Sequence, residues 1–162
     1  MTLNVERVAR VLGAADEALH RLADIDRAYL APAFGPLGES LTWLCAADEL
    51  FGRELASYEA LRGKNDAGRT LPGLRFARNH AVHGTDVASV ANRIQGSELP
   101  GTLPMVLGVA SHLIWAGFSD LPALPAPRPS QERTYSELLA GRPVRTSLET
   151  VLNFLSDVLG DD

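Results

Sequence analysis

The chain has 162 residues, of which 46% are hydrophobic and 22% are charged. A chain of this size buries one core, so we expect a single domain over residues 1–162. The formal net charge of −5 excludes a broadly basic surface for nucleic acid, because such surfaces need clustered Lys and Arg to neutralise phosphates. With a single cysteine, Cys45, the chain has neither a disulfide framework nor a set of cysteine metal ligands.

The first residues of the chain and the lengths of its apolar runs indicate in which cellular compartment the protein is expected. Residues 1–6 have neither the basic start nor the apolar run of a signal peptide, and no window approaches eighteen uninterrupted apolar residues. A lone cysteine fits a reducing compartment. We therefore expect a cytoplasmic protein that does not enter a membrane.

The first predicted element is a helix over about residues 4–30. Apolar residues recur at steps of three and four from Val5 to Leu22, which places one apolar stripe on a helix. Asn4 fits the N-cap position, and Pro32 and Pro36 are expected to end the segment.

The second predicted helix repeats this spacing from about residue 37 to 62, and a loop is expected at 63–68. Asp48 interrupts its apolar stripe. A carboxylate in that position is costly unless it meets a donor, so we expect it to pair with an arginine of another helix, Arg75 or Arg78, or to lie at the wet edge of the stripe.

The third predicted helix starts near Thr70 and ends around Gly84, a residue suited to a helix C-terminus. Helical spacing resumes over 87–95, and a fourth helix is predicted over 105–116. No alternating strand pattern of useful length is evident. These elements predict an all-α fold.

The last quarter of the chain begins with a proline-rich stretch. Four prolines fall within residues 120–130, which favours an extended crossing over the surface. Residues 131–159 are too few to form a core of their own, so we expect them to pack back on the bundle.

Basic side chains gather in one place, with no carboxylate among them: Arg75, Arg78, His80 and His83. RNA cleavage without a metal needs a base for the ribose 2′-hydroxyl proton, an acid for the leaving 5′-oxygen and positive charge on the phosphorane. Histidine exchanges a proton near neutral pH, and arginine presents a charged fork to phosphate oxygens. The cluster therefore contains the residue types that this reaction needs.

The segment Arg78-Asn79-His80-Ala81-Val82-His83 separates an arginine and a histidine by four residues, with an asparagine after the arginine. It resembles the motif of ribonucleases in the HEPN superfamily (higher eukaryotes and prokaryotes nucleotide-binding), in which four to six residues separate an arginine from a histidine and a polar residue often follows the arginine. The resemblance implies a HEPN-like up-and-down bundle of four to six helices. It also implies a metal-independent endoribonuclease, without a cofactor, that acts as a toxin or defence effector.

By this resemblance His83 is the general acid or base, Arg78 clamps the phosphate, and Asn79 orients the phosphate or the histidine. Arg75 and His80 are expected to add to substrate binding. Since residues on a helix advance by about 100°, Asn79 and His83 share a face whereas Arg78 and His83 are about 140° apart. A long arginine side chain, a helix break at Gly84 or a second subunit would close that gap.

HEPN ribonucleases typically dimerise so that two motifs line one cleft. The resemblance therefore implies a homodimer that acts on RNA, with a neutralising antitoxin protein as a further possible partner.

Two other interpretations remain open. The chain could be a non-catalytic helical module that binds a protein or a nucleotide, with the Arg/His cluster in an interface or a salt-bridge network. His80 and His83 could also share a metal, because they are three residues apart on a helix. Further ligands, such as Cys45, Asp86 or His112, form no known zinc pattern with them, so we expect no metal site.

Overall fold

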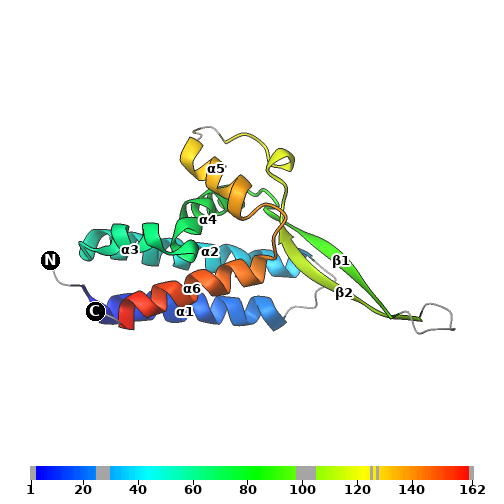
Figure 1. The fold of residues 1–162 in the computed structure, drawn as a ribbon, viewed down its shortest axis with the longest axis horizontal. Helices are drawn as coiled ribbons and strands as arrows, with labels where there is room; N and C mark the ends of the chain where they lie inside the picture. Colours follow the sequence, from blue (N-terminus) through cyan, green and yellow to red (C-terminus); the bar gives the residue numbers. More distant parts are fainter. Residues whose placement is uncertain (1–2, 25–29, 98–104, 125, 127, 161–162) are drawn as a thin grey trace.

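The computed structural model describes residues 3–24, 30–97, 105–124, 126 and 128–160. In these ranges six α-helices pack together and a two-stranded antiparallel hairpin extends away from them (Figure 1). The elements are α1 (Val5–Asp24), α2 (Leu30–Glu54), α3 (Tyr58–Lys64), α4 (Asp66–Val82), β1 (Ala88–Ser97), β2 (Met105–Trp115), the short 3-10 helix η1 (Phe118–Asp120), α5 (Pro129–Leu138) and α6 (Val144–Gly160).

Helix α1 forms where the apolar spacing predicted it. Asn4 caps it, since its side-chain oxygen accepts a hydrogen bond from the backbone N–H of Arg7 at 3.0 Å. Its apolar stripe is buried from Val8 to Leu22, where α1 packs on α2 and α6, whereas Val5 is exposed. The structure describes α1 to Asp24, and the expected end near residue 30 follows residues 25–29, which lie outside the described ranges. The expectation that Pro32 and Pro36 end the segment was wrong, because both prolines lie within α2. Burial of apolar residues on both sides of Pro36 offsets the cost of a proline in a helix.

The expected second helix is divided in two. Helix α2 ends at Glu54 and α3 begins at Tyr58, so the prediction of one helix to residue 62 was wrong. The expected loop at 63–68 is reduced to Asn65, whose side-chain oxygen accepts from the N–H groups of Ala67 and Gly68 and caps α4. Gly68 allows this sharp turn, because a Cβ there would lie 2.5 Å from the carbonyl oxygen of Arg62.

The hairpin corrects the prediction of an all-α fold. Helices were expected over 87–95 and 105–116, but residues 88–97 and 105–115 pair as antiparallel strands, from Ala88 opposite Trp115 to Ser97 opposite Met105. A short apolar run has no unambiguous period, and strand pairing is stabilised by contacts between distant segments rather than by local preference. The fold is therefore mostly helical with a small hairpin.

The base of the hairpin is tied to the turn between α5 and α6. The N–H of Trp115 donates to the carbonyl of Arg142 at 2.9 Å, and the N–H of Gly141 donates to the carbonyl of Trp115 at 3.0 Å. Beneath this base, the buried hydroxyl of Tyr135 donates to the carbonyl of Ala116 at 2.8 Å. The hairpin also starts close to the C-terminus of α4, because only residues 83–87 separate α4 from β1.

Helix α4 lies between α2 and α5, and α6 packs on α1, α2 and α4 (Figure 1). Buried side chains of α6 belong to the same core as those of α1 and α2. None of the helices within the described ranges is long and apolar enough to cross a membrane.

Candidate functional site

The C-terminus of α4 presents the arginine-histidine motif. His83 is the C-cap residue, and Gly84 follows it with a positive φ of 76°. The N–H of Thr85 donates to the carbonyl of His80, and the N–H of Gly84 donates to that of Ala81, both at 3.0 Å. This is the Schellman arrangement, which needs glycine after the cap residue because L side chains rarely adopt a positive φ. The helix break that Gly84 predicted therefore lies directly after His83.

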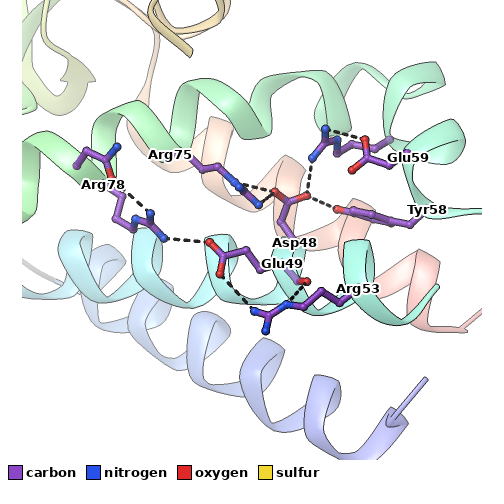
Figure 2. Close-up of polar contacts among 9 residues, drawn as sticks. Asp48, Glu49, Arg53, Tyr58, Glu59, Arg75 and Arg78 are labelled. Atoms are coloured by element: carbon purple, nitrogen blue, oxygen red, sulfur yellow. Dashed lines mark hydrogen bonds and ion pairs between the residues drawn. The ribbon is translucent and has the colours of Figure 1, made fainter. Parts of the chain in front are cut away.

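One turn before the motif, Arg75 is committed to a buried ion cluster. Its Nε and Nη2 donate to the same oxygen, Oδ2, of Asp48 at 3.0 and 2.6 Å (Figure 2). The other oxygen, Oδ1, accepts from the hydroxyl of Tyr58 at 2.7 Å and from Arg62 at 3.2 Å. Asp48 is 1% exposed, so this set of donors replaces the water that its carboxylate loses. Of the two arginines expected to pair with Asp48, Arg75 is the one that does.

The cluster shifts the pKa values of Arg75 and Tyr58. Burial lowers the pKa of Arg75, but the attraction and hydrogen bonds of Asp48 outweigh this effect, and the net shift is upward. Burial and the adjacent Asp48 both raise the pKa of Tyr58, so its hydroxyl stays a donor. The guanidinium of Arg75 is therefore a cation with two of its nitrogens, Nε and Nη2, directed at Asp48.

Arg78 is held more loosely. Its Nη1 lies 3.6 Å from Oε1 of Glu49, and its Nη2 donates to the side-chain oxygen of Asn79 at 3.4 Å (Figure 2). Glu49 is shared with Arg53, 3.5 Å away. The side chain of Arg78 is 28% exposed, so part of its guanidinium faces solvent. Its bond is to Asn79, a residue that shares a helix face with His83 because the two are four positions apart.

The side chain of His83 is exposed at the end of the helix. Its backbone N–H lies one turn after Asn79 and donates to the Asn79 carbonyl at 3.3 Å. Asn79 is half-buried, and its side-chain oxygen accepts from Arg78. Arg78, Asn79 and His83 thus follow one another around the exposed C-terminal end of α4.

His80 points the other way, into the core. It is fully buried, its ring centroid lies 4.4 Å from that of Phe76, and neither ring nitrogen has a hydrogen-bond partner in the described part of the chain. Burial lowers the pKa of His80 and the neighbouring His83 lowers it further, against the opposing effect of Glu132. Its position leaves His80 no surface from which to contact a substrate.

The structure brings no metal ligands together where it can be described. No three His, Cys, Asp or Glu side chains of the described ranges lie close enough to hold a metal ion. Cys45 is fully buried, and burial raises the pKa of its thiol to about 12. A thiol in this state is a core side chain rather than a nucleophile.

Sequence reasoning did not single out Trp43, which is 38% exposed on α2 beside Arg78. It is the more exposed of two tryptophans, since Trp115 is fully buried. The signal was its place off the apolar stripe of α2, because a large aromatic side chain outside such a stripe often marks a contact surface.

The fold and the site together define a mostly helical protein with a hairpin, in which an arginine, an asparagine and a histidine end one central helix. No protein-family model, curated protein or solved structure matches this chain. The resemblance to HEPN ribonucleases therefore rests on the motif, and the activity that it implies is a proposal.

Proposed function

We propose that the protein is a metal-independent endoribonuclease of HEPN type, with Arg78, Asn79 and His83 as its site. One observation carries the proposal. The Arg78 side chain bonds to Asn79, one turn before an exposed His83, so the charged fork and the imidazole lie at the same end of α4. Around the axis of a regular helix, Asn79 lies between Arg78 and His83, so a side chain bonded to Asn79 is directed towards the His83 face.

The reaction assigned to these groups needs no cofactor. The ribose 2′-oxygen attacks phosphorus and loses its proton to a base, while the bond from phosphorus to the 5′-oxygen breaks and that oxygen takes a proton from an acid. The products are a 2′,3′-cyclic phosphate and a free 5′-hydroxyl. His83 exchanges the protons, Arg78 stabilises the charge on the phosphorane, and Asn79 holds the guanidinium in place.

The proposal includes a homodimer. One exposed imidazole serves as base or acid at a given moment, so His83 of the partner subunit supplies the other role in a shared cleft. A dimer also doubles the local positive charge in a chain whose net charge is −5. In the cell, a neutralising protein would be needed to hold such an activity in check.

The expected roles of Arg75 and His80 in substrate binding form no part of the proposal. Arg75 directs its donors at Asp48, and His80 is fully buried. The proposed site is therefore limited to Arg78, Asn79 and His83.

The test is cleavage of a mixed RNA pool by the purified protein in EDTA. Changing His83→Ala or Arg78→Ala is expected to lower the rate by on the order of a hundredfold or more, because each removes a group that acts in the transition state. His20→Ala is the matched control, since His20 is exposed on α1, far from the motif in the chain. Equal cutting by all four proteins would indicate a contaminating nuclease and refute the proposal.

A second candidate is a non-catalytic binding module. It is favoured by the ion pairs of Arg75 and Arg78 with carboxylates of α2, which partly neutralise the cations that RNA would need. Toxicity of the expressed protein separates the two candidates. Relief of toxicity by His83→Ala, with the folded protein still present, supports the ribonuclease, whereas unchanged toxicity supports binding.

A further inference from the structure

An open groove runs between α2 and α4 next to the motif. Its volume is about 400 Å³, within the range of roughly 300–1,000 Å³ that is usual for ligand pockets. Trp43 and Val82, which are 38% and 73% exposed, line it together with Arg78. Gly35 and Gly38 of α2 also line it, and a Cβ built at either would meet no described atom within 4 Å. The groove is thus open, with an aromatic ring and a cation in its walls.

Carboxylates near the groove are paired with cations. Glu39 is bound by Arg21, and Glu49 lies between Arg53 and Arg78. Pairing reduces the repulsion that these acids would exert on an anion. Glu39 and Thr42 also line the groove, but the partly exposed guanidinium of Arg78 is the cation in its wall and can attract a phosphate there.

We propose that this groove binds one unstacked base of a single-stranded RNA, with Trp43 as the stacking surface and the adjoining phosphate beside Arg78. The inference rests on the proposed ribonuclease function and adds a subsite to it. Single-stranded RNA is recognised largely by stacking of splayed bases on aromatic side chains, and an indole accepts any base because every base has a π-face. A nucleotide combines a flat apolar ring with an anion, which matches the tryptophan and the arginine of one groove.

The first experiment measures binding without cleavage. A 2′-O-methylated single-stranded oligonucleotide lacks the attacking hydroxyl, so it remains intact during a titration of the full-length protein. Because Trp115 is fully buried, quenching of tryptophan fluorescence is expected to report Trp43. Trp43→Ala is expected to weaken the affinity on the order of ten- to a hundredfold by anisotropy of a labelled oligonucleotide. Trp43→Phe, which keeps an aromatic ring, should restore most of it.

Phe118→Ala is the matched control, because Phe118 is 41% exposed and does not line the groove. Its affinity for the oligonucleotide should equal that of the unchanged protein. Equal affinity of Trp43→Ala and the unchanged protein would overturn the proposal, as would an equal loss in Phe118→Ala. A third result would also overturn it: sedimentation that shows a dimer for the unchanged protein but a monomer for Trp43→Ala. In that case a second copy of the chain, and not RNA, would cover the groove.

Failure of this inference is distinguishable from failure of the ribonuclease function. If unmodified RNA is cut in a His83-dependent way but Trp43→Ala leaves KM unchanged, the function stands and the base subsite is refuted. If the oligonucleotide quenches the fluorescence of Trp43 but no RNA is cut, the base subsite is supported and the protein is a binding module rather than a ribonuclease. A rise in KM with kcat unchanged in Trp43→Ala supports both.

Discussion

Asp48 and His80 are both buried polar side chains, but they differ in their hydrogen bonds: the first has several partners and the second has none in the described ranges. Asp48 faces α4 from α2 and has donors from Tyr58, Arg62 and Arg75. His80 packs on Phe76 with no partner for either ring nitrogen in the described ranges. A charge enters the core only with a full set of donors, whereas an imidazole enters without partners by remaining neutral. The first arrangement locks α4 to α2, and the second makes the packing around His80 sensitive to protons.

The largest expected effect follows from removing the carboxylate. Asp48→Ala leaves two half-buried guanidinium groups and a buried hydroxyl without their acceptor, so we expect a loss of about 3–5 kcal/mol in the free energy of unfolding. Urea denaturation measures it. Glu59→Ala is the control, because Glu59 pairs with Arg62 from an exposed position and should change stability by less than about 1 kcal/mol. A loss below 1 kcal/mol in Asp48→Ala would show that the cluster does not hold α4.

A smaller effect is expected from removing one donor of the cluster. Tyr58→Phe keeps the ring that stacks on Phe51 but removes the hydrogen bond to Asp48. A bond to a charged group contributes about 1.5–3 kcal/mol, and the two arginines still partner the carboxylate, so the lower end of that range is expected. Denaturation of the Asp48→Ala/Tyr58→Phe double variant completes the cycle. Purely additive losses would contradict a direct coupling of the two side chains.

The smallest effect at neutral pH, and the one that depends on pH, concerns His80. Its pKa in the folded state is lowered, so as pH falls below the ordinary value of 6.5 the unfolded chain binds a proton that the folded chain does not. Stability is therefore lost on acidification, by at most about 1.4 kcal/mol per pH unit from this group.

His80→Leu should remove this contribution and stabilise the protein by about 1 kcal/mol at neutral pH, because an unpartnered buried polar group is replaced by an apolar one. Denaturation at pH 7.5 and 5.5 measures both effects. His20→Leu, at an exposed histidine, should keep the acid sensitivity of the unchanged protein. Parallel pH profiles for all three proteins would rule out His80 as the sensor.

The sequence predicted the helices best where a single apolar stripe runs through the segment. The stripe of α1 and its cap at Asn4 were found from local signals, as was the stop at Gly84. The break between α2 and α3 was missed because both segments share one apolar face, and the turn between them has no glycine or proline. The hairpin was missed because its pairing joins residues 88–97 to 105–115, a contact that no local period reveals.

For the candidate site, the sequence by itself determined which residue types lie near one another: an arginine, an asparagine and a histidine within one and a half turns of helix before a glycine stop. It also required a donor for Asp48. Only the tertiary structure decided between the two arginines, because the choice depends on how α4 packs on α2. Tertiary packing likewise placed His80 in the core and left Trp43 exposed beside Arg78, since burial is a property of neighbouring elements and not of a residue's own position in a helix.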